Sequence, residues 1–315
     1  MKKVSKGYPD AYHVPVLYKE VVESLMINPN GIYYDGTLGG GGHAELFLHK
    51  LSNNAVYIGI DRDAEAIEFA KKRLANYNNL IVYNGTFNMF ESAMKYAGVE
   101  KLDGILLDLG VSTHQIDEDI RGFTFRPGVP LDMRMNNSDS LMAADVLNTY
   151  DEDRLIKIFK EYGEERFSKN IARRIVKRRE DKTITTSDQL LDIINHSVPG
   201  KFLVKSYARI FQALRIEVNN ELDILRDALE QSLIYLEKGG RLGVIAYHSG
   251  EDRIVKEFIQ RQENPCECSK DLPYCVCGKK PQMRRIKPYP ITPAAEEIAE
   301  NPRARSAKFR VGERI

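Results

Sequence analysis

The stretch from residue 34 to residue 43, Tyr-Asp-Gly-Thr-Leu-Gly-Gly-Gly-Gly-His, constrains the fold of this chain more than any other. Four consecutive glycines separate an apolar run that ends at Asp35 from a helix-like segment that begins near His43. Glycine has no Cβ atom, so the backbone can turn sharply and approach a ligand, and the first N–H groups of a helix are open donors. This order of elements predicts a site for a nucleotide-type cofactor.

An acid follows the glycines at an informative distance. Gly39, Gly41 and Ala44 give a partial match to the dinucleotide-binding pattern G-x-G-x-x-G/A. Asp61 comes about 20 residues later, at the end of an apolar run, where such folds place a carboxylate that binds ribose hydroxyls. NAD and S-adenosylmethionine both contain an adenosine ribose, so both cofactors fit. The alternative is a glycine-rich turn without a ligand, which the paired acid disfavours.

Apolar runs and helical patterns alternate along the first third of the chain. Since strands that alternate with helices are typical of parallel sheets, the pattern predicts an α/β fold with a doubly wound, mostly parallel sheet. Its strand ends share one edge, which is where open α/β sheets bind ligands. The predicted strands are residues 31–35, 55–61, 80–84, 102–109 and 241–248, and the predicted helices between them are residues 43–51, 63–76 and 88–97.

The alternation stops after Asp108. Residues 140–216 show helical periodicity and no convincing strand, and structureless connections of that length are uncommon. We therefore expect an inserted all-helical subdomain at residues 136–216 that binds the substrate. Residues 1–135 and 217–315 would form the cofactor-binding domain.

The overall composition excludes few classes of function. Lys and Arg number 46 and Asp and Glu number 45, so net charge does not indicate a nucleic-acid partner. No apolar stretch approaches the roughly 20 residues that span a bilayer, and the first residues lack the apolar region of a signal peptide. We expect a cytoplasmic protein without a membrane partner.

Local charge is more informative than net charge. Residues 166–182 combine apolar positions four apart with a strongly basic face, and basic faces attract phosphate backbones. A solvated helix face is the alternative, because nearby acids neutralise part of the charge. Two further basic clusters comprise Lys279, Lys280, Arg284, Arg285 and Lys287, and Arg303, Arg305, Lys308, Arg310 and Arg314.

All four cysteines lie between residues 266 and 277, as two C-x-C pairs: Cys266, Cys268, Cys275 and Cys277. Four thiolates can hold zinc tetrahedrally, but C-x-C pairs are less usual in structural zinc sites than C-x-x-C pairs. The spacing alone favours a reduced loop without metal, and so few clustered cysteines are typical of a reducing compartment.

Motifs along nearly the whole chain resemble one family, the bacterial 16S ribosomal RNA (cytosine-N4)-methyltransferases, which use S-adenosylmethionine. The resemblance implies a class I, Rossmann-like methyltransferase fold. The motifs that carry it are Asp35-Gly36-Thr37 with Gly41-Gly42-His43, residues 59–63 and 103–112, Arg121-Gly122-Phe123 with residues 130–135, residues 162–167 and 211–216, His248-Ser249 with residues 251–256, and residues 300–306.

The resemblance also implies the residues of the site. Asp61 would accept hydrogen bonds from the ribose, Phe87 would lie against the adenine, and Asp108 would face the methionine end. The catalytic acceptor for the amine proton would be Asp108 or a backbone carbonyl in residues 109–112. Without the family match, Phe87 would be read as core and His43 as a plain first helix residue. The residues implied to bind S-adenosylmethionine are Gly41, Gly42, His43, Asp61, Phe87, Asp108 and Gln115.

The implied reaction is methyl transfer to the N4 atom of a cytidine in the decoding region of 16S ribosomal RNA, with ribosomal RNA or the small ribosomal subunit as partner. Two classes compete with it: a nicotinamide-dependent dehydrogenase and an RNA-binding assembly factor without activity. Within the methyltransferases, the nearest alternative is an enzyme that methylates the N4 atom of cytosine in DNA, or one that methylates a protein. The chain lacks the two prolines and the aromatic residue that DNA amino-methyltransferases usually carry after the acid of the fourth strand, since Leu109-Gly110-Val111 follows Asp108.

Overall fold

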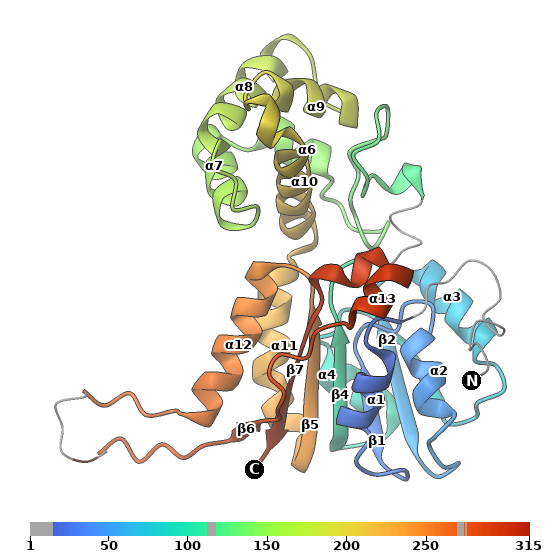
Figure 1. The fold of residues 1–315 in the computed structure, drawn as a ribbon. Helices are drawn as coiled ribbons and strands as arrows, with labels where there is room; N and C mark the ends of the chain where they lie inside the picture. Colours follow the sequence, from blue (N-terminus) through green and yellow to red (C-terminus); the bar gives the residue numbers. More distant parts are fainter. Residues whose placement is uncertain (1–14, 112–117, 270–273, 275) are drawn as a thin grey trace. The chain divides into compact units, whose positions relative to one another are not determined.

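The computed structural model describes residues 15–111, 118–269, 274 and 276–315. They belong to two compact units. One unit comprises Met1–Gly110 together with Asp223–Ile315, and the other comprises Val111–Leu222. Figure 1 shows that the first unit is a sheet covered by helices and that the second is built of helices. Within the described residues, every helix is too short or too polar to cross a bilayer.

The sheet of the first unit has seven strands in the order β3-β2-β1-β4-β5-β7-β6. Strands β1 to β5 pair in parallel, whereas β7 runs antiparallel to both β5 and β6. The predicted doubly wound, mostly parallel sheet is confirmed. The strands are β1 (Ile32–Asp35), β2 (Val56–Asp61), β3 (Leu80–Asn84), β4 (Leu102–Asp108), β5 (Leu236–Ala246), β6 (Met283–Arg285) and β7 (Lys308–Arg314).

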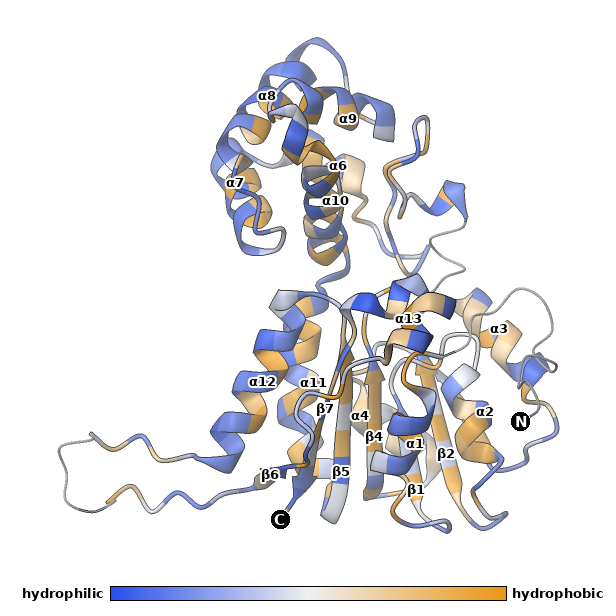
Figure 2. Cartoon of the chain, viewed as in Figure 1, coloured by the Kyte–Doolittle hydropathy of each residue, from blue (hydrophilic) through white to orange (hydrophobic). Residues whose placement is uncertain are grey.

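Helices cover both faces of this sheet, because its strands are apolar on both sides. Side chains alternate along β4: Leu106 joins the core on one face, while Ile105 and Leu107 join the core on the other. Figure 2 shows the central strands as mainly hydrophobic ribbons. One face carries α1 (Tyr18–Leu25), α2 (Gly42–Leu48) and α3 (Ala64–Arg73), and the other carries α4 (Phe90–Ala97), α11 (Glu221–Tyr235) and α12 (Ser249–Glu263).

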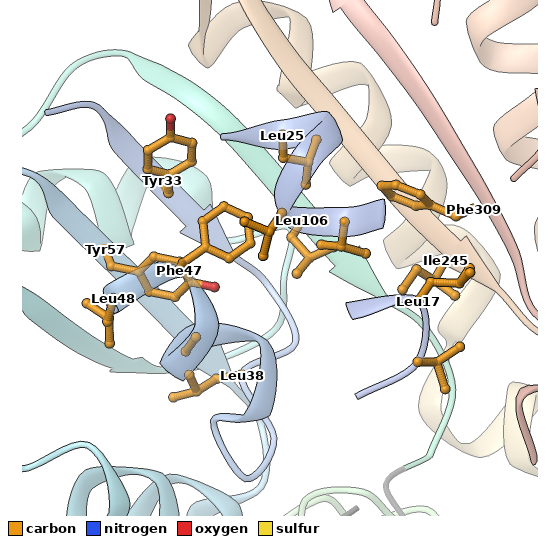
Figure 3. Close-up of a cluster of buried hydrophobic side chains, with 14 of the residues drawn as sticks. Leu17, Leu25, Tyr33, Leu38, Phe47, Leu48, Tyr57, Leu106, Ile245 and Phe309 are labelled. Atoms are coloured by element: carbon orange, nitrogen blue, oxygen red, sulfur yellow. The ribbon is translucent and has the colours of Figure 1, made fainter. Parts of the chain in front are cut away.

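Aromatic side chains fix the position of the helix that follows the glycines. Phe47 of α2 lies between Tyr33 of β1 and Tyr57 of β2, with ring centroids 5.4 and 5.5 Å apart. Figure 3 shows these rings together with Leu106 and Phe309 in one cluster of buried side chains. These contacts anchor the second half of α2 on β1 and β2, and the helix carries His43 one turn before Phe47.

The second unit has its own core, formed by the apolar sides of its helices. The charged helix α8 buries Ile171, Ala172 and Ile175, as its spacing predicts, and no strand is found among the described residues of this unit. The helices are α6 (Ala143–Thr149), α7 (Glu152–Glu161), α8 (Ser168–Asp181), α9 (Ser187–Asn195) and α10 (Leu203–Asn219), with short 3-10 turns η1 (Asp119–Arg121) and η2 (Gly200–Phe202).

The helical unit begins earlier than the sequence predicts, at residue 111 rather than residue 136. Leu131 and Met133 are buried in its core. Asn219 at the end of α10 accepts a hydrogen bond from the Met135 N–H at 2.8 Å and donates one to the Met133 carbonyl at 2.7 Å. The sequence of residues 111–135 has no clear periodicity, and the partner of Met133 and Met135 lies more than 80 positions away, so no local pattern marks this boundary.

Candidate active site

Three aspartates end three neighbouring strands. Asp35 ends β1, Asp61 ends β2 and Asp108 ends β4. Since β1 pairs in parallel with both β2 and β4, these carboxylates lie along one edge of the sheet. This is the edge at which open α/β sheets bind their ligands.

The Asp61 carboxylate is fixed by the backbone around it. Its Oδ2 accepts a hydrogen bond from the Gly39 N–H at 2.7 Å, and its Oδ1 accepts one from the Asp63 N–H at 2.9 Å. Burial raises the pKa of Asp61 to about 6, although these two N–H groups lower it. A carboxylate oxygen has lone pairs for more than one donor, so Asp61 can still accept hydrogen bonds from a ribose diol.

Packing explains two of the glycines that precede the helix. A Cβ atom at Gly41 would lie 2.8 Å from Leu74, and one at Gly42 would lie 2.8 Å from Pro15. Gly39 and Gly41 both have a positive φ, +50° and +78°, but Gly39 differs in its surroundings, because the nearest atom to a Cβ there would be 3.9 Å away. Gly39 therefore borders open space beside Asp61; the sequence analysis includes it in the glycine pattern but not among the predicted cofactor-binding residues. Contacts of Gly41 and Gly42 with the cofactor, through their backbone, stay a prediction.

His43 and Asp108, both predicted cofactor residues, lie close together. The Nδ1 atom of His43 lies 3.6 Å from Oδ2 of Asp108, while Nε2 of His43 lies 3.0 Å from the Val16 carbonyl oxygen. Burial raises the pKa of Asp108 to about 7, against a hydrogen bond from the Tyr247 hydroxyl that lowers it. Burial also lowers the pKa of His43. Asp108 is thus an acid that titrates near neutral pH beside a neutral imidazole.

Residues that the sequence reading did not assign to the site hold Asp108 in place. The Asp108 N–H donates to Thr37 Oγ1 at 2.7 Å, and that hydroxyl donates to Oδ1 of the buried Asp35 at 3.3 Å. The Tyr247 hydroxyl donates to Oδ1 of Asp108 at 2.8 Å. Tyr247 follows β5 directly, so its place at the same edge as the acids was the available signal.

Phe87 is anchored rather than loosely placed. The Tyr34 hydroxyl donates to the Phe87 carbonyl at 2.9 Å, and a Cβ atom at Gly36 would lie 2.6 Å from the Phe87 Cβ. Its ring is partly buried against the core, so stacking on adenine stays a prediction. Gln115, the remaining predicted cofactor residue, lies outside the described residues.

A cavity of about 320 Å³ adjoins Asp108 through Tyr247. Two cations and several hydroxyl groups line it, so the cavity fits an anionic or strongly polar ligand. Lys308 is partly compensated by Asp252 at 3.0 Å, whereas Arg305 is exposed. The lining residues are Tyr247, His248, Ser249, Thr292, Arg305, Ser306, Ala307 and Lys308.

The basic clusters differ in what they leave accessible. Arg310 is only 6% exposed, donates to Asp252 at 2.7 Å and lies over the ring of Tyr289, so it does not belong to a basic surface. That part of the sequence prediction is wrong, because β7 is an internal strand of the sheet. On α8, by contrast, Lys169, Arg174 and Lys177 are all exposed.

Comparisons of the sequence with known proteins all identify the same family. A family model described as the MraW methylase family matches residues 10–315. A protein named ribosomal RNA small subunit methyltransferase H from Clostridium botulinum (strain Kyoto / Type A2) is 48% identical over 305 residues, covering 96% of this chain and 99% of that protein. The protein of the same name from Caldicellulosiruptor saccharolyticus is 48% identical over 304 residues, covering 96% of this chain and 99% of that protein.

Among solved structures, one match is that of an rRNA methylase from Streptococcus thermophilus. It has a TM-score of 0.41 and 10% sequence identity, and the match covers 95% of this chain and 93% of that one. The relationship of this chain to known proteins rests on the family match and the sequence relatives.

Proposed function

Because this chain belongs to the MraW methylase family, we propose that it transfers a methyl group from S-adenosylmethionine to the N4 atom of a cytidine in the decoding region of 16S ribosomal RNA. The observation that carries the proposal is Asp108, a carboxyl group with a pKa of about 7 at the ligand-binding edge of the sheet. The small-subunit ribosomal RNA as substrate agrees with the printed names of the relatives.

The residues along this edge fit the proposed cofactor. S-adenosylmethionine, when bound, supplies an electrophilic methyl group on a positively charged sulfur. Asp61 presents a fixed carboxylate for the ribose hydroxyls, and Gly39 leaves the space beside it open. A cation near Asp108 would lower the pKa of that carboxyl, so Asp108 would bind the cofactor as a carboxylate.

The amine to be methylated needs help from the protein. The N4 lone pair of cytosine is delocalised into the ring, so the amine attacks only as it loses that conjugation and a proton. Asp108 is the acceptor that we assign to this proton, because the Tyr247 hydroxyl and Thr37 hold it in one orientation. Alignment of the amine with the methyl group would supply much of the remaining rate enhancement. No covalent intermediate on the protein is required.

The polar cavity beside Tyr247 supports a role in holding the RNA. Arg305 and Lys308 offer positive charge and Ser249, Ser306 and Thr292 offer hydroxyl donors, which together suit a phosphate of the RNA backbone. The exposed basic residues of α8 in the helical unit would add contacts to flanking phosphates, as predicted for an insertion that binds the substrate. A cytosine within folded RNA would have to leave its stack to react. An enzyme with this substrate would act in the cytoplasm.

The test is methylation of small ribosomal subunits taken from cells that lack the enzyme. Purified protein, labelled S-adenosylmethionine and these subunits are incubated, and the nucleosides are examined by mass spectrometry. We expect N4-methylcytidine in the 16S RNA with the wild-type chain and none with Asp108→Asn. Labelled methyl groups on another nucleoside or on protein would overturn the assignment of cytidine N4 as the methyl acceptor. Bound cofactor without any methyl transfer would indicate an assembly factor instead.

A further inference from the structure

The segment between α12 and β6 carries all four cysteines of the chain. Its described residues form no helix or strand, and Figure 1 shows it as an extended arm of the first unit. Two of its apolar side chains are largely exposed, Tyr274 at 74% and Val276 at 64%. An arm without a hydrophobic core needs another source of order, because short segments cannot bury enough apolar surface to offset their conformational entropy.

Three sulfur atoms meet in this arm. The Sγ atoms of Cys266, Cys268 and Cys277 all lie within 4.8 Å of one another. Sulfurs around a tetrahedral zinc ion, each about 2.3 Å from the metal, are roughly 3.8 Å apart. A disulfide would bring two sulfurs together and would give no reason for a third to join them. The convergence is therefore that expected of a metal site.

The backbone around the sulfurs supports the same reading. The Val276 N–H donates to Cys268 Sγ at 3.4 Å, and an N–H group that points at sulfur stabilises negative charge there. Gly278 has a φ of +65°, which favours glycine and turns the chain directly after Cys277. Residues 266–268 and 276–278 thus come together at the sulfurs.

Charge near the arm is suited to thiolates. Lys279 and Lys280 follow Gly278 after the last cysteine. Lys279 lies 2.5 Å from Glu267, which stands between the first two cysteines, so Lys279 offsets the negative charge of that carboxylate beside the sulfurs. Each thiol loses its proton to solvent when it binds a metal, and neighbouring cations reduce the cost of that charge.

We propose that Cys266, Cys268 and Cys277 bind a zinc ion that closes the arm between α12 and β6. Thiolate ligands select zinc over the hard cations, and a structural zinc ion needs no redox partner. The spacing of the cysteines alone favours a loop without metal, and the positions of the sulfurs reverse that preference. This site is independent of methyl transfer, so its test does not depend on the proposed function.

The test is the metal content of the full chain, purified with a reducing agent and freed of any affinity tag. We expect about one zinc per chain by mass spectrometry of the elements. Cys266→Ser, Cys268→Ser and Cys277→Ser should each lower the zinc retained after dialysis against a chelator by at least tenfold. The matched control is Val276→Thr, in the same arm, which keeps the N–H donor and should keep the zinc.

A second measurement reports metal–thiolate bonds directly, so the proposal can be tested even if a serine variant does not fold. Cobalt added to the wild-type chain after removal of zinc should give the near-ultraviolet absorption of cobalt–thiolate bonds, and that absorption should weaken in each serine variant. A reduced chain that holds no zinc and gives no such band would overturn the proposal. A chain that holds iron in place of zinc, or one whose cysteines form a disulfide, would overturn it as well.

Discussion

His43 and Asp108 face each other across 3.6 Å, with the Nδ1 atom of the imidazole directed at Oδ2 of the carboxyl group. Nε2 of His43 lies 3.0 Å from the Val16 carbonyl oxygen, so that nitrogen carries the hydrogen of the neutral ring. Nδ1 then presents a lone pair to Oδ2 of Asp108 at 3.6 Å. Burial lowers the pKa of His43 and raises that of Asp108 to about 7, so the proton between them belongs to Asp108. The carboxyl group loses it when a cation approaches.

Replacement of Asp108 by asparagine should lower the methylation rate by at least about 100-fold, because the amide keeps the shape and cannot accept the proton. Single-turnover methylation of small subunits measures this effect. Cofactor affinity, measured in parallel, separates binding from chemistry. Full turnover with normal cofactor affinity in this variant would remove Asp108 from the mechanism.

Tyr247→Phe tests whether Tyr247 positions and tunes Asp108. The Tyr247 hydroxyl lowers the pKa of Asp108, so its removal raises that pKa, and the carboxylate then forms at higher pH. Turnover rises with pH as Asp108 ionises, and we expect the rising limb of the pH–rate profile to move to higher pH in the variant, with recovery at alkaline pH. A uniform loss of activity at every pH would indicate a purely structural role.

The raised pKa of Asp108 also lowers the stability of the folded chain at neutral pH. In the folded chain the pKa of Asp108 is about 7, above its ordinary value of 3.8, so the folded state holds this proton more tightly than the unfolded state. The free energy of unfolding therefore falls as pH rises from about 4 to about 7. Asp108→Asn removes this penalty. The difference in melting temperature between the variant and wild type should therefore grow, in favour of the variant, by at least about 2 °C when the pH is raised from 5 to 8. An unchanged difference would contradict the raised pKa.

Arg305 tests the cavity beside Tyr247. Arg305→Gln should weaken RNA binding and reduce the slope of log affinity against log salt by about 0.7, the value for one phosphate contact on single-stranded RNA. Cofactor affinity should not change. Arg226→Gln is a matched control, since Arg226 is exposed and pairs with Asp223 on α11. Equal effects of the two variants would assign Arg305 to general surface charge.

The basic face of α8 is tested separately. Arg174→Gln combined with Lys177→Gln should lower RNA affinity at low salt and have little effect at high salt, because exposed charges are screened. Binding curves at three salt concentrations suffice. If affinity stays the same at low salt, this face is solvated and has no part in binding.

The parallel core could be predicted from the sequence, and so could the placement of two acids at one edge of the sheet. The first four strands have strong apolar runs, and Asp61 and Asp108 follow two of them, so local pattern places them at one edge. Tyr247 was missed because the predicted strand runs to residue 248, which makes Tyr247 look like core, whereas β5 ends at Ala246. β7 was missed because Arg310 and Glu313 interrupt its apolar positions, and their partners Asp252 and Arg241 lie far away in the sequence. No local pattern reveals such pairs.

The two units also differ in how the chain builds them. The helical unit is one continuous segment, Val111–Leu222, whereas the sheet unit is made of two segments. Gly104 of β4 pairs with Arg241 of β5, so that ladder must close a loop that contains the entire helical unit. Loop closure across such a separation slows folding, while the helices form from near neighbours. The helical unit should thus gain structure early and shorten the effective distance between β4 and β5, which makes it an aid to assembly of the sheet.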